Sequence, residues 1–214
     1  MVKKYYVLLL TLIFIGLILL IKTNAINGFD SMIGEELYTI HDEPFLLLVN
    51  WVGMLGSTQG IISVLFLSMI LFILVKKSFL VPALLFLSVL LGNIGNKLLK
   101  AIVARERPSF VSHIEEGFSF PSGHVMVGLI LYGMLAYYLV KSSQQKKTKQ
   151  TIITGISLVL VLIGLSRLIE GEHFLTDVIG GYITGGLMLV GFISIDKFLH
   201  RKLERSKISQ DAAM

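Results

Sequence analysis

Two histidines, an aspartate and several cations are the residues of this sequence that could do chemistry. His173 and Asp177 are four residues apart at the start of a long apolar run, so both side chains would share one face of a helix. A carboxylate bonded to one imidazole nitrogen fixes the tautomer and leaves the other nitrogen basic and nucleophilic. Because such a pair at a helix start is more often structural than catalytic, it predicts no reaction by itself.

The second histidine belongs to the string Pro121-Ser122-Gly123-His124, which lies between a polar loop and an apolar run. The free N–H groups at a helix N-terminus form a ready anion site. Proline, serine and glycine also commonly open helices that have no such function. The string is therefore only a candidate phosphate site until other segments supply cations and a second imidazole.

Three cations are candidates to complete the set. Lys100 and Arg107 are seven residues apart, about two helical turns, and can share one face. A proline follows Arg107, which discourages further helix and directs the arginine into a loop. Arg167 ends another apolar run, where a charge is costly unless it faces a partner or a cavity. Glu170 and Glu172 are possible partners, so a structural role for this arginine stays open.

The chain that must position these groups is expected to be a polytopic membrane protein. Of its 214 residues, 54% are hydrophobic and 15% are charged, with a mean hydropathy of +0.80, whereas about a quarter of a soluble domain is charged. Without cysteine, disulfides, thiolate metal sites and a cysteine nucleophile are excluded. The net charge of +5 would suggest nucleic acid in a soluble protein. Here the basic residues lie beside apolar runs, so we expect membrane orientation and no nucleic-acid partner.

Six apolar runs are long enough to span a hydrocarbon core of about 30 Å. Backbone polar groups must be satisfied internally there, so we expect six helices and an all-α fold in one integral-membrane domain, residues 1–214. The runs are Tyr5–Ile21, Thr58–Val75, Phe79–Leu99, Gly123–Val140, Thr151–Leu168 and Leu175–Phe198. The first could be a secretory signal with a loose cleavage site at Thr23-Asn24-Ala25, but its spanning length favours a retained anchor.

Basic residues set the expected orientation by the positive-inside rule. If the N-terminus is cytoplasmic, the inner segments hold thirteen of the 19 lysines and arginines: Lys3, Lys4, Lys76, Lys77, Lys141, Lys146, Lys147, Lys149, Lys197, Arg201, Lys202, Arg205 and Lys207. Both termini are then inside, with a short cytoplasmic tail at about 199–214. The candidate residues from all three segments reach the outer face.

The other six basic residues lie at or near that outer face: Lys22, Lys97, Lys100, Arg105, Arg107 and Arg167. Positive charge on the translocated side opposes the insertion bias and therefore indicates an anion site. Alternatively, Lys97 and Lys100 extend to the lipid headgroups and bind no ligand. We favour that interpretation for Lys97 and leave it open for Lys100.

The outer segment 24–57, between the first two runs, is too patterned for a plain loop. Apolar residues recur in it among acidic ones: Leu37, Ile40, Phe45, Leu47, Leu48, Trp51, Val52 and Leu55. We expect part of it to lie in the interface as amphipathic helix, with Trp51 at headgroup depth and with breaks at Pro44 and Gly53. A lipid gate and a structural cover are equally compatible with this pattern.

Phosphoryl transfer through a phosphohistidine is the reaction for which the combined set is suited. Cations hold the equatorial oxygens, one histidine attacks, and the other protonates the leaving oxygen. The cations can replace Mg²⁺ in neutralising developing charge. Because histidine and aspartate are too sparse for a metal cage, we expect no metal and no cofactor.

Eleven positions in three motifs resemble the tripartite signature of the type 2 phosphatidic acid phosphatase superfamily. The motifs are Lys100 with Arg107-Pro108, Pro121-Ser122-Gly123-His124, and Ser166-Arg167 with His173 and Asp177. The resemblance implies that His173 is the nucleophile, that Asp177 orients it, and that His124 is the acid. It further implies that the phosphate is held by Lys100, Arg107, Arg167 and the backbone at Ser122 and Gly123.

The resemblance also implies a function and a location. The soluble haloperoxidase branch is excluded by the six spans, and among membrane members the bacterial phosphatidylglycerophosphatases look closest in size and layout. We therefore expect a metal-independent lipid phosphatase in a bacterial plasma membrane, acting at the outer face on phosphatidylglycerol phosphate. Undecaprenyl diphosphate hydrolysis and phosphoryl transfer to a lipid or sugar acceptor are the alternatives, and a lipid-phosphate binder or flippase is disfavoured. No protein partner is expected.

Overall fold

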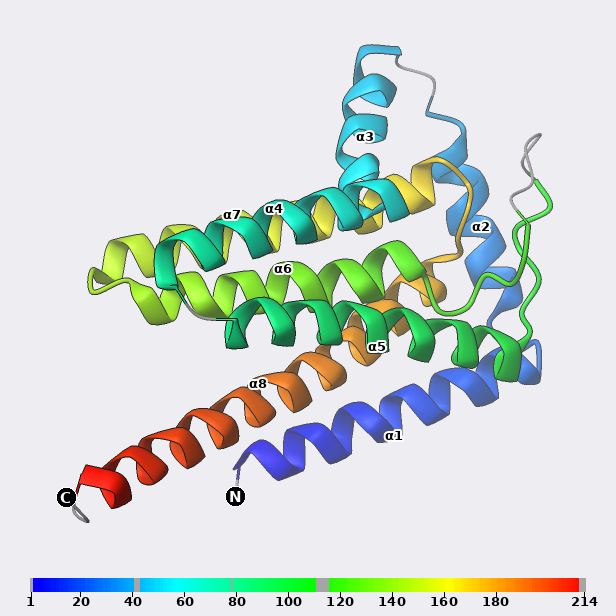
Figure 1. Ribbon diagram of the computed structural model, residues 1–214. Coiled ribbons are helices and arrows are strands. Elements are labelled where there is room, and N and C mark those ends of the chain that lie inside the picture. Colours follow the sequence, from blue (N-terminus) through cyan, green and yellow to red (C-terminus); the bar gives the residue numbers. More distant parts are fainter. Residues whose placement is uncertain (1, 41–42, 78, 111–115, 212–214) are drawn as a thin grey trace.

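Every secondary-structure element among the described residues is a helix, which confirms the predicted all-α fold. The structure is a computed structural model that describes residues 2–40, 43–77, 79–110 and 116–211. Its helices are α1 (Val2–Lys22), α2 (Asn27–Tyr38), α3 (Glu43–Gly56), α4 (Thr58–Lys76), α5 (Leu80–Val103), α6 (Gly123–Ser142), α7 (Lys146–Ile169) and α8 (Leu175–Asp211) (Figure 1).

Six of these helices, α1 and α4 to α8, are long and apolar enough to cross a membrane, which confirms the six predicted spans. The helices extend further than the apolar runs at their polar ends. α7 begins at Lys146, and α8 continues beyond Phe198 to Asp211. Lysine, glutamine, arginine and glutamate dominate these extensions and are good helix formers, so the helices persist outside the apolar stretch. The last three residues of the predicted tail lie outside the described ranges.

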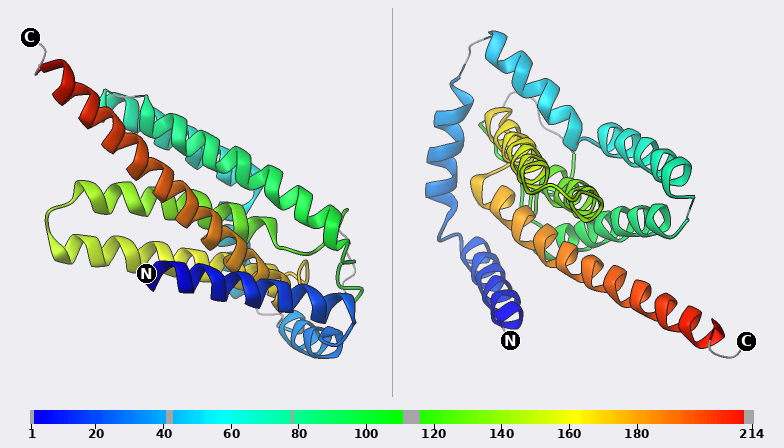
Figure 2. Two further views of the ribbon diagram at one scale, coloured as in Figure 1. Left: turned by 90° about the horizontal axis from the view of Figure 1, so that it is seen from below. Right: turned by 90° about the vertical axis from the view of Figure 1, so that its left-hand side faces the viewer.

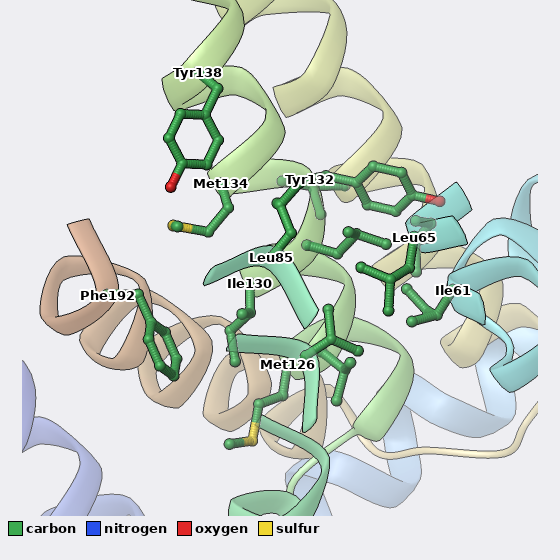
Figure 3. Packing of buried hydrophobic residues seen from close by; sticks show 14 residues of the cluster. Ile61, Leu65, Leu85, Met126, Ile130, Tyr132, Met134, Tyr138 and Phe192 are labelled. Carbon is green, nitrogen blue, oxygen red and sulfur yellow. The ribbon is translucent and has the colours of Figure 1, made fainter. Parts of the chain in front are cut away.

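α6 is the central helix of the bundle. It packs against α5, α7 and α8 and also contacts α3 and α4, and Figure 2 shows it in the interior while α1 lies at the edge beside α8. Figure 3 shows the largest cluster of buried apolar side chains, which includes Met126, Ile130 and Met134 of α6, Ile61 and Leu65 of α4, Leu85 of α5 and Phe192 of α8. In a bilayer, close side-chain packing of this kind holds helices together.

A second apolar cluster lies beside the start of α6. Phe14 of α1 stacks on Phe120 with ring centroids 5.7 Å apart, and Val103 and Ile183 pack into the same cluster. Phe120 directly precedes the Pro121–His124 string. Residues of α1, α5 and α8 therefore pack around Phe120 and fix the position at which α6 starts.

The predicted outer segment forms two helices, α2 and α3, and α3 projects away from the bundle in Figure 1. α3 exposes Phe45, Leu48 and Trp51 along one side, as expected of an interfacial helix. The predicted break at Gly53 is wrong, because α3 continues through it to Gly56. At Gly53 an added Cβ would overlap the Arg167 guanidinium, so the glycine permits close packing on α7. Pro44 lies in the first turn of α3, where proline is tolerated.

The chain termini lie at one end of the bundle, together with the α6–α7 connection (Figure 1). The C-terminal ends of α5 and α7 and the starts of α6 and α8 meet at the opposite end. That opposite end carries the three motif segments.

Candidate active site

The His173–Asp177 pair is buried at the start of α8. The His173 Nδ1 lies 3.4 Å from the Asp177 Oδ2, and the side chains are 2% and 0% exposed. Burial lowers the pKa of His173 below its ordinary value, and the Asp177 carboxylate opposes that shift. The imidazole is therefore held neutral at pH 7, with Nδ1 toward the carboxylate and Nε2 left for another partner.

The charges of Lys100 and Arg107 also act on His173 and lower its pKa further. They come from the first motif. α5 ends at Val103 because Ala104 adopts a left-handed conformation, with φ of 49°, and its N–H donates to the Lys100 carbonyl. The chain then continues without regular structure through Arg107, whose Nη1 donates to the Glu172 carbonyl at 2.9 Å. This bond connects the first motif to the loop that carries His173.

The start of α6 is tied to two neighbouring helices. The Ser122 N–H donates to the Asp177 carbonyl at 3.0 Å, and the Asn96 side chain donates to the Pro121 carbonyl at 3.1 Å. Ser122 therefore cannot offer its N–H to a phosphate, in contrast to the expectation that its backbone holds the anion. Its Oγ is fully buried and has no hydrogen-bond partner among the described residues, so the hydroxyl is the group that fits an anion.

His124 lies in the first turn of α6 and is half-buried. It lines one cavity with Lys100 and Arg107, and the charges of Arg167 and His173 also act on it. The end of α3 lies against it, because a Cβ added at Gly56 would be 3.1 Å from the His124 Cβ. The second imidazole thus shares one set of cations with the first.

Arg167 is buried and paired with acidic side chains. Its Nη2 lies 2.5 Å from the Glu170 Oε2, its Nη1 pairs with Glu172, and its Nε donates to the Ser166 Oγ at 3.1 Å. Both partners that the sequence suggested are therefore used. These contacts engage one N–H on each nitrogen, whereas a guanidinium has five N–H donors, so Arg167 retains donors for an anion.

A buried ionic network that sequence reasoning missed lies behind Asp177. The Arg105 Nη1 donates to the Asp177 Oδ1 at 2.8 Å, and its Nη2 donates to the Asp30 Oδ2 at 2.6 Å. Asp30 belongs to α2 and also accepts from the Thr176 N–H at 3.1 Å. The Arg105 guanidinium lies 4.2 Å from the centre of the Phe174 ring. Arg105 was visible in the sequence only as one more outer cation, and no local pattern links it to Asp30.

A groove of about 500 Å³ leads to this cluster from between α4, α5 and α6. Its polar end is formed by Lys100, Arg107, Gly123 and His124. Its walls are apolar, and several wall residues are exposed at the bundle surface, including Ile62, Phe66, Phe86 and Leu90. The groove therefore joins the cationic site to the surface that faces lipid.

All eight residues that the sequence assigned to the site lie at this end of the bundle: Lys100, Arg107, Ser122, Gly123, His124, Arg167, His173 and Asp177. Within the described ranges, no group of three or more histidine, aspartate or glutamate side chains could hold a metal ion. Lys100, Arg107, Gly123 and His124 line one groove, and the buried His173 and Arg167 lie at the same end of the bundle. This arrangement has the groups that binding and transfer of a phosphate require.

Comparisons with known proteins agree with this geometry. Residues 81–201 match the PAP2 superfamily. The chain is 32% identical over 198 residues to phosphatidylglycerophosphatase B of Bacillus subtilis (strain 168), covering 90% of this chain and 95% of that protein.

Two solved structures are similar. The first transmembrane PAP2-type phosphatidylglycerolphosphate phosphatase from Bacillus subtilis superposes with a TM-score of 0.84 at 30% identity, covering 90% of this chain and 96% of that one. Aquifex aeolicus LpxE shares the fold, with a TM-score of 0.60 at 20% identity over 78% of this chain and 95% of that one. The resemblance seen in the motifs is thereby confirmed: the chain belongs to the PAP2 superfamily and is one of its membrane lipid phosphatases.

Proposed function

We propose that the protein, acting as one integral-membrane domain, removes the terminal phosphate of phosphatidylglycerol phosphate through a phosphohistidine at His173. The observation that carries the proposal is the buried His173–Asp177 pair beside an apolar groove with a cationic end. The groove suits acyl chains, and its cationic end suits a phosphate. The relatives named for phosphatidylglycerol phosphate hydrolysis support this choice of lipid.

The phosphate is bound by the side chains of Lys100, Arg107 and Arg167, by the Ser122 hydroxyl and by the N–H of Gly123 at the start of α6. A trigonal phosphoryl group spreads its charge over three oxygens, and cations fixed in advance stabilise that charge most in a site that excludes water. Because Arg167 already pairs with two carboxylates, it is positioned before the lipid arrives.

In the first step the His173 Nε2 attacks phosphorus, and the bond from phosphorus to the lipid oxygen breaks. His124 donates a proton to that oxygen, and phosphatidylglycerol leaves. In the second step His124 takes a proton from water, the water oxygen bonds to phosphorus, and the bond from phosphorus to His173 breaks. Asp177 holds the imidazole tautomer and stabilises its positive charge throughout.

Arg105 and Asp30 are proposed as positioning residues that hold Asp177. A carboxylate with a fixed guanidinium on one oxygen cannot rotate away from His173. Since Asp30 lies on α2, and Gly53 and Gly56 pack α3 against Arg167 and His124, segment 24–57 acts as structural support for the site and not as a gate.

Transfer of labelled phosphate to the enzyme tests the covalent step. Rapid quenching of wild type with phosphatidylglycerol phosphate carrying a labelled terminal phosphate should trap acid-labile, base-stable label on the protein. His124→Ala should accumulate this label, because it slows the hydrolysis of the phosphoenzyme. Absence of enzyme-bound label in both proteins during steady turnover would exclude the phosphohistidine.

The substrate is tested by comparing kcat/KM for phosphatidylglycerol phosphate, phosphatidate and undecaprenyl diphosphate, in detergent and in bilayers. A clear preference for undecaprenyl diphosphate would assign the protein to the alternative substrate. Label that appears on an added lipid or sugar instead of as free phosphate would assign it to the transferases. Activity should survive excess chelator, because cations from the protein neutralise the phosphate.

The proposed orientation has both termini in the cytoplasm of a bacterial cell and the active site outside. The distribution of lysine and arginine supports it. A membrane-impermeant thiol reagent applied to intact cells should label a cysteine that replaces Glu106, and it should not label one that replaces Lys146. The reverse pattern would invert the topology.

A further inference from the structure

Two polar residues in the groove have no part in the chemistry proposed above. Asn93 and Lys97 of α5 line the groove together with Asn96 and Lys100. Asn96 is buried and bonded to the Pro121 carbonyl, and Lys100 belongs to the phosphate site. Asn93 and Lys97 are exposed, and no acidic side chain in the described ranges pairs with Lys97.

Both residues occupy costly positions. Lys97 is six residues, about 9 Å, before the end of α5, and Asn93 is about 6 Å deeper still. The groove walls beside them are apolar, for example Phe86, Val89 and Leu90. An ammonium or amide at that depth is expensive unless it serves a polar ligand or reaches the interface. Lys97 could extend to the headgroups, but the short side chain of Asn93 cannot.

Their spacing aligns them with the phosphate site. Asn93, Lys97 and Lys100 stand at i, i+4 and i+7, which is one face of the helix. Lys97 is about 4.5 Å below Lys100 along the helix axis, and its flexible stem adds reach. A lipid with its terminal phosphate at Lys100 and its acyl chains in the groove therefore places the intervening part of its headgroup beside Lys97.

We propose that Lys97 and Asn93 form a second anion subsite for the phosphate group that lies between the acyl chains and the phosphate being removed. The ligand class is a lipid with two phosphate groups, either a phosphodiester plus a terminal phosphate or a diphosphate. Phosphatidate lacks this second group, since its single phosphate is the one removed. The subsite therefore selects for two-phosphate lipids. This inference rests on the proposed position of the terminal phosphate at Lys100 and Arg107.

The test measures selectivity with three short-chain substrates in detergent: phosphatidylglycerol phosphate, farnesyl diphosphate and phosphatidate. Lys97→Met keeps the length of the side chain and removes its charge. It should lower the ratio of kcat/KM for a two-phosphate lipid to that for phosphatidate about tenfold, mainly through KM. Asn93→Leu should lower the ratio about threefold, and Lys97→Arg should restore most of it. A fall confined to one two-phosphate lipid would identify which kind the subsite binds.

Lys22→Met is the matched control, because it removes an exposed cation from the outer end of α1, outside this groove. Its ratios should equal those of wild type. An unchanged ratio in both Lys97→Met and Lys97→Gln would overturn the subsite and leave Lys97 as a headgroup anchor. Turnover of all three lipids by His173→Ala would instead overturn the proposed function itself.

Discussion

Two histidine–aspartate pairs with a spacing of four residues belong to the α8 segment, one at the start of the helix and one in its C-terminal half, and they differ in what surrounds them. The first pair is His173 with Asp177, and the second pair is Asp196 with His200, whose Nδ1 lies 3.2 Å from the Asp196 Oδ1. Both carboxylates are fully buried. The His173 side chain is 2% exposed, whereas that of His200 is 35% exposed.

The second pair holds two helices together. Asp196 accepts hydrogen bonds from the hydroxyls of Tyr137 at 2.7 Å and Tyr138 at 3.0 Å, and Lys141 lies 3.4 Å away. These bonds connect α6 to α8. The His200 Nδ1 also lies 3.0 Å from its own helix's Asp196 carbonyl, so the ring is held against its own helix.

The first pair has the surroundings of a candidate active site. Its carboxylate is held by Arg105, and its imidazole lies within the field of Lys100 and Arg107 beside the start of α6. The groove reaches this end of the bundle at His124. Spacing alone therefore makes a contact between histidine and aspartate. Burial of the imidazole, nearby cations and access for a substrate turn that contact into a candidate active site.

Removing each imidazole should give the largest contrast. His173→Ala should lower phosphate release from phosphatidylglycerol phosphate by at least about 10³-fold, because the nucleophile is lost. His200→Ala should stay within about twofold of wild type. Initial rates of phosphate release from purified, folded variants measure both effects. Near-normal turnover in His173→Ala would contradict the assignment of the nucleophile.

Neutralising each carboxylate should separate catalysis from stability. Asp177→Asn should lower kcat by about 10² to 10⁴-fold, because an amide cannot stabilise the imidazolium or hold the same tautomer. Asp196→Asn should leave kcat nearly unchanged and lower stability by about 1–3 kcal/mol, because the bonds from Tyr137 and Tyr138 are weakened. Stopped assays and thermal unfolding in detergent measure the two quantities. A large loss of kcat in Asp196→Asn at intact stability would remove the distinction.

The cations beside the two carboxylates provide a smaller contrast. Arg105→Met should lower kcat about 10- to 100-fold with little change in KM, because Asp177 loses the group that fixes its orientation. Arg105→Lys should restore part of kcat. Lys141 is the half-exposed cation beside the buried Asp196. Lys141→Met should therefore have little effect on kcat. If Arg105→Met raised KM and left kcat intact, Arg105 would contact substrate and not position Asp177.

The sequence predicted the helices, and the meeting of the motif segments at one end of the bundle, better than it predicted the bonds among the motif residues. Apolar runs of spanning length have one structural solution in a bilayer, so the six spans were accurate to within a few residues at their apolar ends. The motif residues could be grouped because charge asymmetry placed all three segments at one end. These inferences use local pattern and side-chain chemistry alone.

The bonds that the sequence left hidden depend on tertiary packing. Arg105 and Asp30 are 75 residues apart, and nothing local to either residue indicates that α2 packs against α7 and α8. The sequence pattern predicts a helix break at Gly53, whereas in the structure the absence of a side chain at Gly53 lets α3 pack closely against Arg167. The Ser122 N–H was assigned to phosphate, but it pairs with the Asp177 carbonyl. Such pairings follow only once the helices are placed side by side.

The pH dependence of activity should give the smallest difference between the two histidines. Burial and the charges of Arg107 and Lys100 lower the pKa of His173, so its imidazole stays neutral as the pH falls through 6.5, the ordinary value for histidine. The acidic limb of kcat/KM that reports His173 should therefore lie below pH 6.5. In Lys100→Met this limb should move to higher pH, since losing a nearby positive charge makes protonation easier. His200→Ala should give the wild-type profile. Comparing variants on one lipid cancels the ionisation of the substrate phosphate, and a downward shift in Lys100→Met would contradict the placement of that charge beside His173.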